Sequence, residues 1–182
     1  MAQEQEFGPG DIFLVPQSDG LWTIGQVLER PMAAASCLLS EQRIERDGVA
    51  GVDLDRALCA SACLSALWAT PEHLKSGRWP VVGRHKILLR RRQWANERQR
   101  RKRWEGATTR GGALVEAFLE AYYGLEYWDK WYDPEYLDQY LFPGRARPPG
   151  VKLGAANPHR GRPAPVMREP PTPSSEGADT PE

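Results

Sequence analysis

This sequence lacks three features that would place a protein in or beyond a membrane. No apolar run in its 182 residues approaches the roughly 20 residues that span a bilayer. The opening residues, MAQEQEFGPGD, are polar and acidic and lack the charged and then apolar pattern of a signal peptide. The three cysteines, Cys37, Cys59 and Cys63, are an odd number and too sparse for a disulfide scaffold. We therefore expect a soluble, cytoplasmic protein with reduced thiols and no membrane partner.

Common motifs of catalysis and phosphate binding are also missing. The sequence has no glycine-rich phosphate loop, no Gly-x-Ser-x-Gly turn and no His-Glu-x-x-His helix. Its three histidines, His73, His85 and His159, lie far apart and have no nucleophile signature beside them. These absences argue against an enzyme, so we expect no catalytic residues.

Two groups of residues have side chains that could hold a metal ion. The thiol and imidazole group, suited to zinc, comprises Cys37, Cys59, Cys63 and His73. The carboxylate group, suited to a hard divalent cation, comprises Asp129, Asp133, Glu135 and Asp138. No second paired cysteine motif accompanies the first group, and helix capping or solvent exposure accounts for the second. We therefore expect neither a metal nor a cofactor.

Charge is balanced over the whole chain but segregated along it. The 24 basic and 24 acidic side chains give a net charge of zero, which argues against a general polyanion binder. Between Arg84 and Arg103, however, ten residues are Lys or Arg and only Glu97 is acidic. Such a basic run can pair with acidic residues of the same fold or present a charged face to a partner.

The aromatic residues crowd into one acidic segment. Ten of the seventeen, including all six tyrosines, lie between Phe118 and Phe142, where Lys130 is the only basic residue. Tyrosine and tryptophan are favoured at interfaces, although rings at helical spacing more often pack in a core. Helical spacing places Phe118 and Tyr122 in the core. The residues that we predict to bind a partner are Tyr127, Trp128, Asp129, Trp131, Tyr132, Asp133 and Tyr136, together with Arg98 and Arg101 of the basic run.

Proline marks a domain boundary. Ten of the sixteen prolines lie from Pro143 onward, in a segment with almost no large apolar residues. Such a segment cannot bury enough apolar area to offset its ordering entropy. We therefore predict a flexible N-terminus over residues 1–9, one globular domain over residues 10–143, and a disordered tail rich in proline and glycine over residues 144–182.

Strand signals dominate the first half of the domain. Residues 11–15 and 21–28 are predicted to form a hairpin around a Ser-Asp-Gly turn, and residues 32–40 a third strand. Residues 53–68 fit either a helix or a buried strand of small residues. Residues 79–83 read as an edge strand because they contain a proline.

Helix signals dominate the second half. Thr70 is predicted to cap a short helix that begins with Pro71, and Asp133 to cap another over residues 134–141. Apolar residues at helical spacing predict a helix over residues 112–123. Together these patterns indicate an α+β fold: a small bent antiparallel sheet, SH3-like or a partial barrel, followed by helices and an aromatic-rich C-terminal module.

Three sequence blocks, in order, are spread over most of the length of residues 8–143. The first combines GDIF (residues 10–13) with GQV (residues 25–27), the second is GRWPVVG (residues 77–83), and the third runs from Tyr123 to Asp138. These blocks resemble the immunity protein 26 family of bacterial polymorphic toxin systems. The resemblance implies a small protein without catalytic residues that binds a cognate toxin domain and neutralises it by stoichiometric occlusion. The basic run from Arg90 to Arg103 is longer than the resemblance implies, and the proline-rich tail lies outside the match.

Nucleic-acid binding is the main alternative. A basic helix in the Arg84–Arg103 run, with Trp94 and Trp104, would combine phosphate contacts with stacking rings, and a curled sheet would suit a small-barrel RNA binder. The neutral total charge and the acidic segment nearby argue against this alternative. We therefore favour a cytoplasmic toxin-binding protein over a nucleic-acid-binding one.

Overall fold

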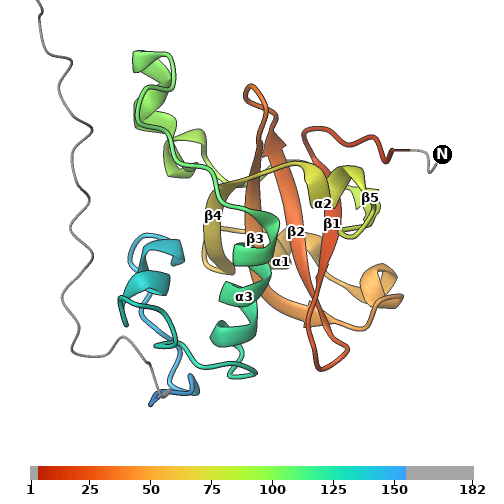
Figure 1. Ribbon diagram of the computed structural model, residues 1–182. Coiled ribbons are helices and arrows are strands. Elements are labelled where there is room, and N and C mark those ends of the chain that lie inside the picture. The colour runs from red at the N-terminus through yellow and green to blue at the C-terminus, as the bar shows by residue number, and fades with distance from the viewer. Residues whose placement is uncertain (1–3, 155–182) are drawn as a thin grey trace, which may run out of the picture.

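The computed structural model describes residues 4–154, which form an open antiparallel sheet with helices packed on its faces (Figure 1). The strands are β1 (Asp11–Pro16), β2 (Trp22–Glu29), β3 (Ala35–Ile44), β4 (Cys63–Ala69) and β5 (Val81–Arg84). Their order across the sheet is β4-β3-β2-β1-β5, so β4 and β5 form its two edges. The predicted α+β class, with a sheet that does not close into a barrel, is confirmed.

The predicted hairpin of β1 and β2 is also confirmed, with Phe13 opposite Gly25 in its register. The turn contains Gly20 at φ +87°, a left-handed conformation that glycine adopts at little cost. Gly25 serves a different purpose, because the Phe13 ring lies against its backbone. A Cβ at this position would lie 2.5 Å from Cε2 and 2.9 Å from Cε1 of Phe13. Only glycine therefore allows this packing.

Both faces of the sheet are covered, because alternate side chains of each strand point to opposite faces. One face packs against α3 (Gly112–Tyr122), which contributes Val115 and Phe118 and lies across the sheet in Figure 1. The other face packs against α1 (Leu54–Ala57), Leu89 and Phe142. The middle of β1 and most of β2 are consequently continuous runs of buried residues.

The segment that fitted either a helix or a strand contains both. Asp53 caps α1 by accepting a hydrogen bond from the backbone N–H of Arg56 (3.2 Å), and the chain then continues into β4. The strand predicted over residues 32–40 is confirmed, although β3 begins at Ala35 and continues to Ile44. A short helix follows Thr70 as predicted, but the N-cap of α2 (Glu72–Lys75) is Pro71 and not Thr70.

Two segments predicted as α-helices are instead 3-10 turns. The helix expected over residues 134–141 is η4 (Tyr136–Tyr140), because Asp133 accepts a hydrogen bond from Glu135 N–H (2.9 Å) in a tight turn before it. The basic run forms η2 (Arg91–Gln93) and η3 (Glu97–Lys102). Basic side chains three or four positions apart repel one another on an α-helix, which disfavours that form here. A further 3-10 turn, η1 (Gly48–Gly51), lies between β3 and α1. No helix within residues 4–154 is long and apolar enough to cross a membrane.

The folded part begins earlier than predicted. Residues 4–9 were expected to belong to a flexible N-terminus, but Phe7 is buried and the Arg30 guanidinium lies 4.4 Å from its ring centroid. The Gln5 side chain donates hydrogen bonds to the carbonyls of Leu74 (2.7 Å) and Trp79 (3.0 Å). These contacts tie the segment to the sheet.

The folded part also ends later than predicted. Residues 144–154 were expected to belong to the disordered tail, but Arg147 donates two hydrogen bonds to Asp138 (2.6 and 2.5 Å). The backbone N–H of Trp128 donates to the Lys152 carbonyl (2.9 Å). Arginine and backbone contacts hold this segment together with a single apolar residue, Val151, that packs on the core, so its composition gave little sign of order. Residues 155–182 of the predicted tail lie outside the described residues.

We expect Gly25→Ala to lower the free energy of unfolding by about 1 to 3 kcal/mol, because the added methyl group would overlap the Phe13 ring. Gly83→Ala in β5 is the matched control, since a Cβ there would have no heavy atom within 4 Å. That variant should be neutral or slightly stabilising. Urea unfolding of both purified variants measures the difference, and equal stabilities would contradict the packing described.

Candidate functional site

Two tryptophans hold the basic run against the folded core. Trp104 packs edge-on against Trp68 of β4, with ring centroids 4.8 Å apart, and the Arg100 guanidinium lies 4.4 Å from the Trp104 ring centroid. Trp94 packs against the core that contains Leu89 and Phe142 and donates from Nε1 to the Leu89 carbonyl (3.0 Å). These anchors fix the positions of η2 and η3, which carry the arginines between them.

Asn96 closes the loop that carries η3. It adopts φ +57°, a left-handed conformation that asparagine tolerates better than most residues. Its side chain accepts a hydrogen bond from Thr108 N–H (3.1 Å) and donates one to the Thr108 carbonyl (2.9 Å). Arg103 and Trp104 are also left-handed, with φ of +52° and +70°. Such conformations persist only where the surroundings enforce them, and here the Asn96 clamp and the packing of Trp104 do so.

Two glutamates fix one pair of arginines. Glu29, the last residue of β2, forms ion pairs with Arg100 and with Arg91 (3.4 Å). Glu97 contacts the same two guanidinium groups, at 2.9 Å from Nε of Arg100 and 3.5 Å from Nε of Arg91. The hydrogen bond with Glu29 raises the pKa of the Arg100 guanidinium above its usual value. This four-residue network joins the sheet to both 3-10 turns.

Other basic side chains of the run have no such partner. Within residues 4–154 the following are exposed and form no ion pair or side-chain hydrogen bond: Arg92, Arg98, Arg101, Lys102 and Arg103. Their charge is therefore available to a binding partner.

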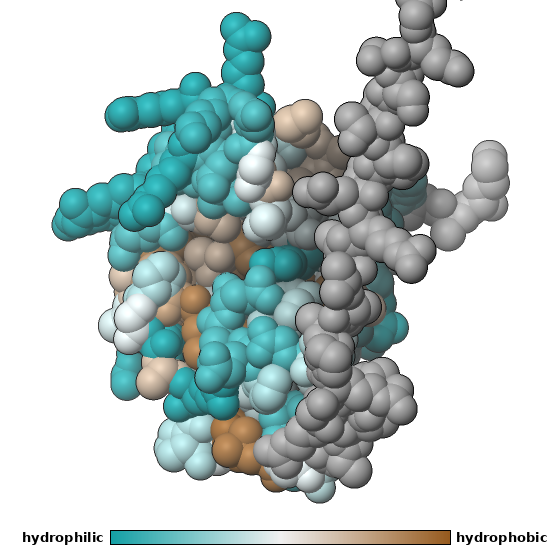
Figure 2. All heavy atoms as spheres, turned by 60° about the vertical axis from the view of Figure 1, so that its left-hand side comes forward, coloured by the Kyte–Doolittle hydropathy of each residue, from teal (hydrophilic) through white to brown (hydrophobic). Residues whose placement is uncertain are grey.

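Paired and unpaired arginines meet around one hollow. Its volume is about 660 Å³, and it is lined by Glu97 together with Arg91, Arg92, Arg98, Arg100 and Arg101. We call these five arginines the arginine surface. Figure 2 shows hydrophilic side chains projecting from the end of the molecule at which Figure 1 places η3. The positive charge of the arginine surface favours binding of anionic groups.

Trp128, predicted to contact a partner, is part of the core. Its side chain is fully buried and packs edge-on against Phe118, with ring centroids 5.9 Å apart. Its Nε1 donates to Asp138 (3.0 Å), and hydrogen bonds from Arg147 hold the pKa of that carboxyl below its usual range. The prediction for Trp128 is therefore wrong, because α3 and residues 144–154 cover the connector that carries it.

The remaining predicted residues of the aromatic segment divide between interior and surface. Asp129 is buried and accepts a hydrogen bond from Gly154 N–H (2.9 Å), so the prediction of a surface contact is wrong for it as well. Trp131 and Tyr136 are half-buried and pack against the core that contains Trp128. The predicted residues that remain exposed are Tyr127, Tyr132 and Asp133.

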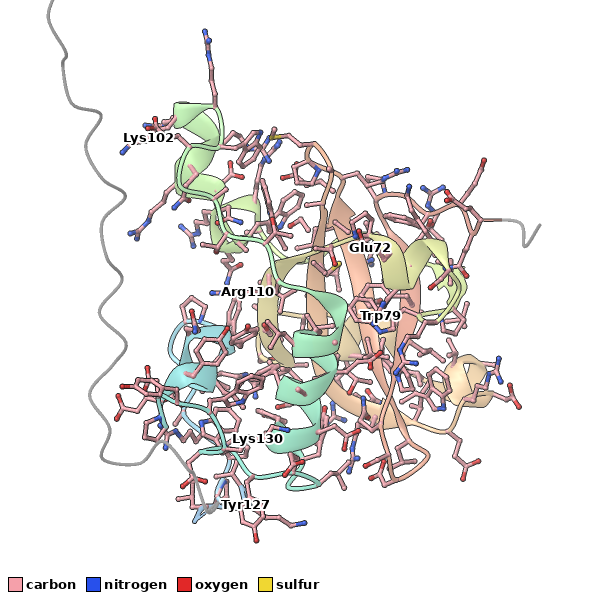
Figure 3. The ribbon with its side chains drawn as sticks, in the orientation of Figure 1. Glu72, Trp79, Lys102, Arg110, Tyr127 and Lys130 are labelled. Atoms are coloured by element: carbon pink, nitrogen blue, oxygen red, sulfur yellow. The ribbon has the colours of Figure 1, made fainter. Side chains whose placement is uncertain are left out.

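The structure does not bring the two predicted groups together. Arg98 and Arg101 lie on η3 beside Lys102, which Figure 3 places at the upper end of the molecule, whereas Tyr127 and Lys130 lie at the lower end. The predicted site residues also omitted five members of the arginine surface and its network: Arg91, Arg92, Arg100, Glu29 and Glu97. The density of basic residues could have identified the arginines. No local pattern points to Glu29, which lies 71 positions before Arg100.

The residues considered as metal ligands are engaged elsewhere. Among residues 4–154, no three His, Cys, Asp or Glu side chains are grouped as a metal site requires. Cys37 and Cys63 are buried, and burial raises the pKa of both thiols. Of the carboxylates, Asp138 pairs with Arg147 and Asp129 with the backbone of Gly154.

Several aromatic residues of the blocks that carry the family resemblance lie inside the fold. Phe13 of the first block stacks on Trp79 of the second, with ring centroids 5.6 Å apart and ring planes at 10°. Trp128 and Asp138 of the third block are joined by the hydrogen bond described above. The sequence matches no protein-family model and no curated protein, and the structure matches no solved structure. The resemblance therefore rests on the sequence blocks alone.

We expect Trp128→Ala to lower the free energy of unfolding by about 3 to 5 kcal/mol, because it removes a fully buried indole. The adjacent Tyr127 is 42% exposed, so Tyr127→Ala should cost less than about 1 kcal/mol. Thermal and urea unfolding of the two variants measure the contrast. A stable Trp128→Ala protein would show that this ring is not part of the core.

Proposed function

We propose that this chain is an immunity protein that binds a cognate toxin domain and neutralises it by covering the toxin's active site. The observation that carries the proposal is the contact between the first two blocks of the resemblance, in which Phe13 lies against Gly25 and stacks on Trp79. Residue types far apart in the sequence are matched in size at this contact. Their fit supports treating the blocks as one fold signature, and with it the function that the signature implies.

Occlusion needs a rigid binding surface and no chemistry of its own. A sheet covered on both faces and the loop clamped by Asn96 supply rigid support, which limits the entropy lost on binding. Binding should be about nanomolar or tighter, because one uninhibited toxin molecule turns over many substrate molecules. We place this encounter in the cytoplasm, so the targets are toxins that act on cytoplasmic substrates.

Co-expression tests the proposal directly. The chain should restore growth of a bacterial host that is killed by the toxin domain encoded beside it, and the two purified proteins should form a stoichiometric complex. Trp128→Ala is the negative control, since loss of the core should abolish protection. Continued killing in cells that contain the soluble, folded wild-type protein would reject the proposal.

The arginine surface favours nucleic-acid binding as a second candidate. Guanidinium groups pair well with phosphates, and Trp94 and Trp104 lie beside them. Both rings are already engaged, however, because Trp104 lies between Trp68 and Arg100 and Trp94 packs on the core. Stacking of bases needs a free ring face. We therefore rank this candidate second.

A salt titration separates the two candidates. We expect no binding of single-stranded RNA or double-stranded DNA tighter than about micromolar at physiological salt, and little dependence on salt concentration. Fluorescence anisotropy with labelled oligonucleotides measures both quantities. Submicromolar binding with a steep salt dependence, lost in an Arg98→Ala, Arg101→Ala double variant, would reverse the ranking.

A further inference from the structure

Resting on the proposed function, we propose that the arginine surface is the part of this chain that docks on the toxin, and that it recognises a patch of Asp and Glu carboxylates. The resemblance supplies neither the contact residues nor the chemistry of the partner's face. Both come from the position, pairing and exposure of the arginines around the hollow.

The surface is organised before any partner arrives. Glu29 and Glu97 hold Arg91 and Arg100 in fixed positions, so these two guanidinium groups are ordered before binding. Arg92, Arg98 and Arg101, the unpaired side chains of the surface, line the same hollow. Docking on them breaks no ion pair within residues 4–154, and the fixed positions of Arg91 and Arg100 reduce the entropy lost on binding.

Arginine chemistry points to carboxylates. A guanidinium is a planar fork that donates two parallel hydrogen bonds to one carboxylate, which gives geometric specificity as well as attraction. A hollow of about 660 Å³ has room for several acidic side chains. Clustered positive charge also speeds encounter with an acidic face, which suits an inhibitor that must bind the toxin before it acts.

Glu97, which lines the hollow, and Glu29, which pairs with two of its arginines, favour a protein partner over a nucleic acid. Glu97 lines the hollow, and Glu29 lies behind it with its side chain partly exposed. A phosphate backbone carries uniform negative charge, so it cannot avoid these carboxylates. A protein surface can place acidic residues opposite Arg98 and Arg101 and neutral or basic residues opposite Glu97.

Charge reversal on the purified complex tests the inference. We expect the Arg98→Glu, Arg101→Glu double variant to bind the toxin domain encoded by the neighbouring gene about 100-fold more weakly than wild type. Arg98→Lys with Arg101→Lys keeps the charge and removes the fork, so an intermediate loss of about 10-fold is expected. Arg56→Glu is the matched control, because Arg56 is exposed on α1 and its side chain has no partner within residues 4–154. Its affinity should change less than about threefold.

A second measurement identifies the groups on the toxin. Lys102 is exposed beside Arg101, so carbodiimide treatment of the wild-type complex should couple its Nζ to a toxin Asp or Glu as an amide, with loss of water. Peptide mass spectrometry identifies the linked pair. Cross-links that map only to other faces of this chain would overturn the inference.

The outcomes distinguish a failure of this inference from a failure of the proposed immunity function. If the wild-type chain protects and the folded double variant binds as tightly as wild type, the surface assignment is wrong and the immunity function stands. If the wild-type chain neither binds nor protects, both fail. If the double variant instead loses submicromolar binding to RNA or DNA oligonucleotides, the arginine surface is a nucleic-acid site and the inference is overturned.

Discussion

The contact of the Phe13 ring with the backbone of Gly25 is the constraint on which the rest of the fold depends. Any side chain at position 25 would displace the ring, and with it the stacked indole of Trp79. Trp79 in turn holds the segment that leads into β5 and donates from Nε1 to Glu116 on α3 (3.0 Å). The absence of a side chain at Gly25 therefore determines how the β1–β2 hairpin, β5 and α3 pack against one another.

The pairing of a buried tryptophan with a carboxylate occurs again near the C-terminal end of the described residues. Phe118 of α3 meets Trp128, whose Nε1 donates to Asp138 as that of Trp79 does to Glu116. Each indole buries a large apolar area while its one polar atom keeps a hydrogen bond. Burial alone would raise the pKa of Glu116, but hydrogen bonds from Arg78 and Trp79 hold it below its usual range. Part of the apparent acidic surface thus consists of partners for buried rings.

Local patterns predicted what local contacts determine. The hairpin of β1 and β2 follows from two β-rich apolar runs around a turn, and α3 follows from helical spacing; these elements are present where expected. Trp128 could not be placed, because its burial depends on residues 144–154, whose order comes from Arg147 and backbone hydrogen bonds that composition does not reveal. The arginine surface could be predicted from the basic run. Its division into paired and unpaired arginines could not be predicted, because Glu29 lies on β2, far from the run in the sequence.

The network around Glu29 separates the arginines that are tied to the fold from those that are not. Glu29 ends β2, the strand that contains Gly25, so the framework that carries the resemblance also sets the position of the arginine surface. Arg91 and Arg100 are tied to it, and replacing either would leave Glu29 and Glu97 with one guanidinium partner each instead of two. Arg98 and Arg101 have no partner within residues 4–154, so replacing them should cost the fold little. Under our proposal that this surface docks on an acidic partner, we expect substitutions at these two positions to change specificity without loss of stability.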